Sequence, residues 1–373
     1  MDGVGQEAFD RLRLIRSENI GPVTYRHLIR RFGSAAQALD AIPALAARGG
    51  GRSPRIAGAK QVERELQAIQ KLGARLLFLG DPAYPPLLAE LGNAPPLLLW
   101  QGRLELLERP IVAMVGARNA SAAACRFAHG LASNLVEAGV CIVSGLAKGI
   151  DTAAHRGSLD MATIAVIAGG PDIFYPPENE DIQRTIAERG LLLAEQPPGT
   201  EPRARHFPYR NRIIAGLARG TVVVEAAPRS GSLITARLAA EAGRQVMAVP
   251  GSPLDPRSRG CNMLIRDGAT LIQSADDVLE LIRHFDIRAE SANPDQELRT
   301  NRDEAIMSDT GQTDIDGSAR APVIDLLSIT PVTVDELVRQ SGLPPSSVQL
   351  ALLELELAGR LTRHAGARVS LLH

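Results

Sequence analysis

Short apolar runs alternate with helical patterns through the middle of the chain. Each run is rich in Val, Ile and Leu, and the stretches between them carry apolar residues at helical spacing. Continuous apolar strands that alternate with amphipathic helices are typical of a mostly parallel sheet covered on both faces. We therefore predict a doubly wound α/β domain with strands at Ile111–Val115, Cys141–Val143, Thr163–Ile167, Leu191–Ala194, Thr221–Val224, Gln245–Val249 and Ala269–Ile272.

A helical pattern precedes this domain. Apolar residues at helical spacing fall in the stretches 9–15 and 25–32, on either side of Ile20-Gly21-Pro22. Two helices joined by a tight turn resemble a SAM or helix-hairpin-helix module, which can hold a phosphate on backbone N–H groups. A purely structural helical cap fits the same pattern. The Pro-rich stretch that follows predicts a connector leading into an edge strand at Leu97–Trp100.

The end of the chain predicts a linker and a small helical domain. Residues 289–317 carry eight acidic and two basic residues and little periodicity, which favours a flexible linker. Thr333 and Glu336 have the spacing of a capping box. The opening of the expected recognition helix, at residues 344–347, carries no Arg or Lys, so docking is favoured over DNA reading. Three helical patterns and a short strand predict a winged helix, at Val323–Leu327, Thr333–Ser341, Ser346–Ala358 and Val369–Leu372.

Composition supports a multidomain intracellular protein. The chain has 373 residues, of which 45% are hydrophobic and 22% charged, and a net charge of −1, so any nucleic-acid site must be a local basic patch. Three widely spaced cysteines argue against a zinc site or a disulfide framework. The apolar runs are too short to span a membrane, which predicts a cytoplasmic location. We expect a helical domain at 1–75, a Rossmann-like core at 76–288, a linker at 289–317 and a winged helix at 318–373.

Several predicted strands end in loops suited to anions. In parallel sheets, ligands bind beyond the carboxyl ends of the strands. One loop offers Gly116 and Arg118, with Ser121 at the start of the next helix. The other loops offer two further sets that combine glycines with hydroxyl or Lys side chains before a helix. These sets are Ser144, Gly145, Lys148 and Gly149 after the second strand, and Ser230, Gly231 and Ser232 after the fifth.

The strongest local signal is a basic stretch that contains aromatic rings. Phe207 and Tyr209 stand among five arginines within seventeen residues, in a chain with only 3% aromatic residues. Arg for the phosphates and a ring for base stacking is the combination that single-strand binders use. Packing of Phe207 in the core, with the arginines in water, explains the composition equally well. The residues that we single out are Arg205, Phe207, Arg210, Asn211 and Arg212.

An enzyme is the alternative. Asp151 and His155, four residues apart, could form an acid–base pair, although a helix N-cap beside a hydrogen-bonded histidine is favoured. Glu225, at a strand end, could act on a nucleotide as in lysine-decarboxylase-like phosphoribohydrolases, but the P-G-G-x-G-T run of that group is absent. A dinucleotide dehydrogenase is disfavoured, because no GxGxxG follows the first strand. A scaffold whose winged helix docks a partner is the third class.

Six motifs in order resemble the DprA/Smf family of bacterial DNA-processing proteins. They are VAMVGARNAS, SGLAKGIDTAAH, the Tyr175-Pro176 region with Asn179, FPYRNRIIAGL, VVVEAAPRSGSLITA and AVPGSPLDPRSRGCNMLI. The match covers roughly residues 76–281. One departure is visible: the family commonly has an aromatic-Gly pair soon after the first-loop serine, where this chain has Ala123-Ala124. That departure puts a ring contact in doubt there.

The resemblance implies binding of single-stranded DNA and its delivery to the recombinase RecA from a homodimer. It implies no catalytic residue, no cofactor and no metal. Matched residue by residue, Arg118 and Lys148 would be the principal phosphate contacts. Phe207, Arg210 and Arg212 would line the same groove, and Gly116, Ser144, Gly145 and Gly149 would shape its backbone.

Overall fold

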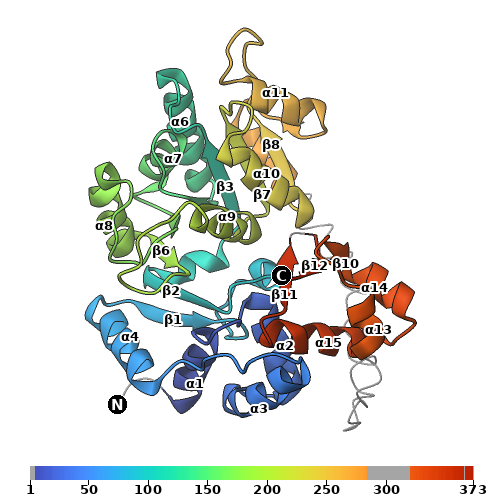
Figure 1. Ribbon diagram of the computed structural model, residues 1–373. Helices are drawn as coiled ribbons and strands as arrows, with labels where there is room; N and C mark the ends of the chain where they lie inside the picture. Colours follow the sequence, from blue (N-terminus) through green and yellow to red (C-terminus); the bar gives the residue numbers. More distant parts are fainter. Residues whose placement is uncertain (1–4, 284–319, 365, 373) are drawn as a thin grey trace. The chain divides into compact units, whose positions relative to one another are not determined.

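The computed structural model describes residues 5–283, 320–364 and 366–372. Over these ranges the chain forms two compact units, one from residues 64–283 and one from residues 5–63 with the described residues beyond 320. Helix α4 (Ala59–Lys71) leads from the first segment into the larger unit (Figure 1). The predicted linker at 289–317 lies outside the described residues, and the four domain boundaries stay predictions.

The larger unit contains a nine-stranded sheet in the order β1-β2-β6-β5-β4-β3-β7-β8-β9. All pairs are parallel except β1 with β2 and β2 with β6. The mostly parallel doubly wound sheet predicted from the apolar runs is confirmed. The strands are β1 (Arg75–Phe78), β2 (Leu97–Gly102), β3 (Ile111–Gly116), β4 (Cys141–Ser144), β5 (Thr163–Ile167), β6 (Leu191–Ala194), β7 (Gly220–Val224), β8 (Gln245–Ala248) and β9 (Thr270–Leu271).

The prediction of an edge strand at Leu97–Trp100 is wrong. This segment forms β2, which pairs with both β1 and β6. Pro95 and Pro96 suggested an edge because proline cannot donate to a ladder, but both precede the strand and leave its N–H groups intact. The outer strand on this side is β1, whose four residues are too few to show a clear alternation in the sequence.

The chain order places helices on both faces of the sheet. From β3 the chain moves outward to β4 and β5, and later from β7 outward to β8 and β9. Right-handed crossovers then put α6 to α8 on one face and α10 on the other (Figure 1). The topological switch point therefore lies between β3 and β7. The helices are α5 (Pro86–Ala89), η1 (Leu104–Glu108), α6 (Ala122–Glu137), α7 (Ile150–Ser158), η2 (Pro177–Asn179), α8 (Glu180–Arg189), α9 (His206–Leu217), α10 (Gly231–Glu241) and α11 (Arg259–Arg266).

The smaller unit combines the N-terminal helices with the winged helix. The helices predicted on both sides of Ile20-Gly21-Pro22 are present. Thr333 caps its helix by accepting the Glu336 N–H at 3.2 Å, as the capping-box spacing predicted. The elements are α1 (Gln6–Ile15), α2 (Pro22–Phe32), α3 (Ala35–Arg48), α13 (Arg320–Asp325), β10 (Val332–Thr333), α14 (Val334–Ser341), α15 (Pro345–Leu357), β11 (Leu361–His364) and β12 (Arg368–Leu371).

Helix α15, in the position of a recognition helix, is buried within this unit. Leu353 and Leu357 join the core of the N-terminal helices, while Leu352 and Leu355 face the winged-helix core. Glu354 is paired with Arg48 of α3 at 2.8 Å. A helix that is apolar on opposite sides fits burial between two layers. This packing leaves less of α15 free to enter a DNA groove, and the docking role of the winged helix stays a prediction.

Candidate nucleic-acid interface

Two loops at the carboxyl edge of the sheet press against each other. Gly149 has φ +77°, and a Cβ added there would overlap the carbonyl oxygen of Ala117 and lie 2.7 Å from that of Arg118. The Ile150 N–H donates to the Ala117 carbonyl at 3.2 Å. Only glycine fits this position, because its backbone angle and its close contact both exclude a side chain. The loop of Lys148 is thereby fixed beside the loop of Arg118.

Four side chains gather at this edge, and we call Arg118, Lys148, Tyr175 and Phe207 the cationic aromatic cluster. The Arg118 guanidinium carbon lies 5.2 Å from the centroid of the Phe207 ring, within the range of a cation–π contact. The Tyr175 ring lies 5.7 Å from the same ring. Arg118 and Lys148 are exposed, and Tyr175 is 46% exposed. The cluster therefore presents cations and a ring to solvent together.

Tyr175 is the member of the cluster that the sequence did not single out as a contact. It lies after β5 and before η2, in a segment without a basic residue, where Gly169 and Gly170 follow the strand but no cation, Ser or Thr accompanies them. The available signal was its aromatic ring in a chain with only four tyrosines. Its partner Phe207, by contrast, stands in the basic stretch at the start of α9.

Lys148 already has an anionic partner. Its Nζ lies 2.5 Å from a carboxylate oxygen of Glu178, which belongs to η2. The hydrogen bond from Lys148 lowers the pKa of Glu178 below its usual value. Both side chains are more than half exposed, so this ion pair is of the weak, solvent-screened kind. A phosphate could replace the carboxylate at small cost.

The buried Asp151 carboxylate binds the backbone of the loop that carries Lys148. It accepts the N–H groups of Gly145 at 3.2 Å and Ala147 at 3.3 Å. Burial raises the pKa of Asp151, and the Arg210 charge and these N–H groups oppose that shift. The expected helix N-cap is therefore wrong in detail. Gly149 is the N-cap residue of α7, and Asp151 binds the loop that precedes the helix.

Arg210 and Arg212, predicted to line the groove, are both buried. Arg210 Nη1 donates to the Val166 carbonyl at 2.9 Å, and burial lowers the pKa of Arg210 to about 10, so it stays charged at neutral pH. A Cβ on Gly145 would overlap the Arg210 guanidinium, so glycine makes room for it. Arg212 is paired with Glu195. Both arginines lie beneath the exposed edge.

The first predicted anion site, at the start of α6, is taken by a carboxylate of the protein. Glu225 accepts the Ser121 N–H at 2.8 Å and the Ser121 hydroxyl at 2.5 Å. Ser121 also caps α6 by accepting the Ala124 N–H at 3.1 Å. The close approach that Gly116 allows is internal, because a Cβ there would overlap the Val224 carbonyl oxygen. This helix start is thus already occupied by a negative charge.

The remaining predicted residues are the buried Ser144 and a group at the start of α10. Ser144 is fully buried, and its hydroxyl donates to the Met114 carbonyl at 2.6 Å. Ser230 is the N-cap of α10, where its hydroxyl accepts the Ser232 N–H at 3.3 Å. Asn211 of α9 donates to the Gly231 carbonyl at 3.5 Å, which links the α10 start to the helix that begins with the basic stretch.

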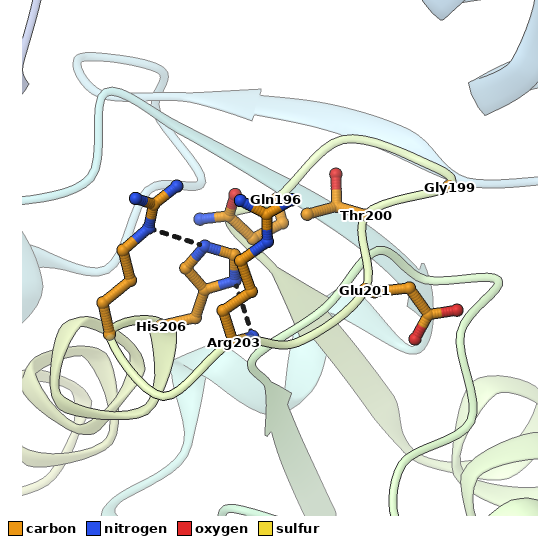
Figure 2. A pocket seen from close by; sticks show the side chains of 7 residues that line it. Gln196, Gly199, Thr200, Glu201, Arg203 and His206 are labelled. Carbon is orange, nitrogen blue, oxygen red and sulfur yellow. Dashed lines mark hydrogen bonds between the residues drawn. The ribbon is translucent and has the colours of Figure 1, made fainter.

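Arg205 belongs to a cavity of about 390 Å³ just before Phe207 (Figure 2). Arg203 and Arg205 supply its cations and Glu201 its carboxylate. Burial, with the neighbouring Arg205 and Arg203 charges, lowers the pKa of His206, which therefore stays neutral at pH 7. The cavity is lined by Gln196, Gly199, Thr200, Glu201, Arg203, Arg205 and His206. In the sequence, the last lining residue directly precedes Phe207 of the cluster.

Asp151 and His155, which were considered as an acid–base pair, are buried and do not bond to each other. His155 is fully buried, its Nδ1 lies 2.8 Å from the Thr163 hydroxyl, and burial lowers its pKa to about 3. Asp151 faces the loop instead. Within the ranges that the structure describes, no three His, Cys, Asp or Glu side chains lie close enough to hold a metal ion.

No helix in the described ranges is both long and apolar enough to cross a membrane.

Comparisons with known proteins match all three parts of the chain. The family model described as DNA recombination-mediator protein A covers residues 75–283, more than half of the sequence. A DprA-like N-terminal HHH domain matches residues 5–68, and a DprA winged helix domain matches residues 308–367. The resemblance to the DprA/Smf family that six motifs indicated is therefore confirmed. The N-terminal helical domain and the C-terminal winged helix match domains of the same family.

Curated relatives and solved structures agree with this assignment. DNA processing protein DprA of Streptococcus pneumoniae is 51% identical over 201 residues, which cover 53% of this chain and 71% of that protein. Protein Smf of Synechocystis is 35% identical over 81% of both chains. The structure of Streptococcus pneumoniae DprA has a TM-score of 0.63 and 36% identity, and covers 74% of this chain and 98% of that one. The chain belongs to the DprA/Smf family of DNA-processing proteins.

Proposed function

We propose that this chain binds single-stranded DNA at the cationic aromatic cluster and acts by holding the strand rather than by a catalytic step. The observation that carries the proposal is the placement of Arg118 against the Phe207 ring, 5.2 Å away, beside exposed Lys148. Single-strand binders without sequence preference combine cations that follow the phosphate backbone with an aromatic ring on which a base can stack. Duplex DNA keeps its bases stacked internally and gains nothing from the ring.

A solved relative supports the same ligand. A structure of DNA processing protein A from Helicobacter pylori is described as showing its single-stranded DNA binding mode. It is 28% identical to this chain, with a TM-score of 0.52, and covers 57% of this chain and 96% of that one. The family shared with this protein makes a DNA strand the natural ligand for a cluster of this chemistry.

The predicted site residues take different roles in this proposal. Arg118 and Lys148 contact phosphates, and Phe207 with Tyr175 stacks on bases. Arg205 of the neighbouring cavity extends the phosphate track. The buried Arg210 and Arg212 support the site from within, as do Ser144, Gly145, Gly149 and Gly116. Ser121, Asn211, Ser230, Gly231 and Ser232 form or tie together the helix starts beside it.

We further propose that the bound strand is presented to RecA, that the protein works as a homodimer, and that it does so in the cytoplasm. The family description, DNA recombination-mediator protein, supports the step to a recombinase. A mediator must hold strands of many different sequences and release them. An exposed, salt-sensitive phosphate site meets that requirement better than a deep enzyme pocket.

Charge reversal tests the proposal. We expect Arg118→Glu with Lys148→Glu to abolish binding of an oligo-dT strand in fluorescence anisotropy, without a change in melting temperature. The matched control reverses Arg109 and Arg189, two exposed arginines that stand two residues before β3 and β6, at the opposite edge of the sheet. Normal binding by the Arg118/Lys148 variant, or equal loss in the control, would show that the cluster is not the site.

The phosphoribohydrolase alternative gains no support from the geometry. Glu225 is held through both carboxylate oxygens by Ser121. His155 is fully buried, and its low pKa leaves it neutral at physiological pH without access to a substrate. We therefore propose that neither group acts as a catalyst.

A further inference from the structure

A second cavity lies at the topological switch point of the sheet. It has a volume of about 360 Å³ and is bounded by the start of α6 after β3, the end of β7 and the loop after β8. In open α/β sheets, the crevice beside a switch point is the usual place for a ligand. Ser121 borders this cavity, while Arg118 of the cationic aromatic cluster stands three residues earlier in the same loop.

The polar end of this cavity is a carboxylate with free acceptor capacity. Glu225 lines the cavity and accepts two hydrogen bonds from Ser121, at 2.8 and 2.5 Å. An ionised carboxylate offers about four lone-pair positions, so about two remain for a ligand. Its negative charge, placed at the N-terminus of α6, opposes the binding of a phosphate there. The ligand that fits is an uncharged group rich in N–H donors.

The walls of the cavity are mostly apolar. Phe127 from α6, Val224 from β7 and Val249 after β8 surround the space, and Ser258 adds one hydroxyl. A pocket of a few hundred Å³ with apolar walls and one orienting polar group is typical of small-molecule sites. A flat heterocycle fits between these apolar walls with its N–H edge directed toward the Glu225 carboxylate.

We infer that this cavity binds a guanine base, with Glu225 accepting from its N1–H and its exocyclic amino group. These adjacent donors match the two oxygens of one carboxylate. Adenine and cytosine place a ring acceptor beside their amino group, and thymine flanks its single N–H with two carbonyls, so each sets an acceptor against the carboxylate. The base could come from the bound strand, which rests on the proposed function, or from a free nucleoside.

The test uses the full-length protein with two ligands. One arm compares an oligo-dT strand with the same strand carrying central dG residues, by competition anisotropy. The other titrates guanosine alone by calorimetry, with thymidine as control. We expect the dG strand to bind at least about fivefold more tightly, since one bidentate base contact discriminates by this much or more. Guanosine binding without strand preference would support the cavity with a free nucleoside as its ligand.

Two variants separate the cavity from the phosphate site. Glu225→Gln keeps the shape of the side chain but loses one acceptor, and Ala123→Trp fills the cavity from the exposed first turn of α6. Both should bind oligo-dT as the wild type does, melt cooperatively, and lose the preference for guanine. Equal affinity of the wild type for both strands together with no guanosine binding would overturn the inference. A preference that survives both variants would do the same. Loss of all strand binding would contradict only the proposed function, because the titration of guanosine tests the cavity without a DNA strand.

Discussion

At the scale of single residues, the cations of the cationic aromatic cluster are held by partners that a DNA strand can replace or join. Arg118 rests on the Phe207 ring, and Lys148 pairs with Glu178 at 2.5 Å. The ring leaves the guanidinium edge open to a phosphate, whereas the carboxylate competes with it directly. On the proposed function, Glu178 therefore competes with DNA for Lys148.

Removing that competitor should strengthen binding. We expect Glu178→Gln to raise the affinity for oligo-dT by no more than about fivefold, since an exposed, solvent-screened ion pair competes only weakly. Glu180→Gln is the control, because Glu180 lies two residues away but pairs with Arg184 at 2.7 Å. Anisotropy titrations at fixed salt measure the effect. An equal gain in both variants would point to general electrostatics rather than to release of Lys148.

His155 makes a separate prediction about acid stability. Its pKa falls from 6.5 to about 3 in the folded protein, so below pH 6.5 the unfolded chain takes up a proton that the folded chain refuses. The contribution of the neutral His155 side chain to the free energy of unfolding is fully present above pH 6.5 and is lost as the pH falls toward 3. His155→Gln should flatten the pH dependence of the unfolding free energy by about 1.4 kcal/mol per pH unit between pH 6 and 4.

Urea denaturation at several pH values measures that slope. His129→Gln, at an exposed position of α6, controls for the loss of a histidine. A slope unchanged in the His155 variant would mean that this imidazole is not protected from protonation.

The residue scale is also where the sequence was least sufficient. Arg210 and Arg212 stand in the same basic run as Arg205, yet they are buried and Arg205 is exposed. Composition alone cannot show which side of a helix faces the core when both sides carry arginine. The burial of Arg210 depends on Gly145 and Val166, which are distant in the sequence.

At the scale of elements, one glycine sets the distance between two loops. Gly149 combines φ +77° with a close contact to Ala117 and Arg118. We expect Gly149→Ala to lower the unfolding free energy by about 1–3 kcal/mol for the backbone angle, with more from crowding, and to weaken strand binding by separating Arg118 from Lys148.

Gly139→Ala separates the two costs. Gly139 has φ +88° but nothing within 4 Å of an added Cβ, so its variant reports the backbone angle alone. Thermal melts and anisotropy of both variants make the comparison. If the Gly139 variant were destabilised as much as the Gly149 variant, the contact between the loops would carry no weight.

Elements were well predicted where burial covers both faces. The seven apolar runs from Ile111 to Ile272 all became strands. Strands β4 to β7 are buried throughout, and a strand buried on both sides must be apolar throughout. The outer strands β8 and β9 are partly buried and exposed, respectively. The four-residue β1 was missed, and the position of β2 was wrong. Strand order depends on pairings distant in the sequence, and no local pattern states which neighbours a strand will have.

At the scale of the whole molecule, charge is local rather than global. The chain has a net charge of −1, so no long-range attraction draws it to nucleic acid. On the proposed function, binding comes from the few cations at one edge of the sheet. The number of phosphates that these cations neutralise is therefore the quantity on which the account depends.

The salt dependence of single-strand affinity measures that number most directly. The logarithm of the association constant should fall linearly with the logarithm of salt concentration. For Arg118→Ala with Lys148→Ala, the slope should be shallower by about 1.4, roughly 0.7 for each lost phosphate contact. Arg109→Ala with Arg189→Ala should leave the slope unchanged. A slope identical in the wild type and the Arg118/Lys148 variant would contradict DNA binding at the cationic aromatic cluster, because these two cations would then contact no phosphate.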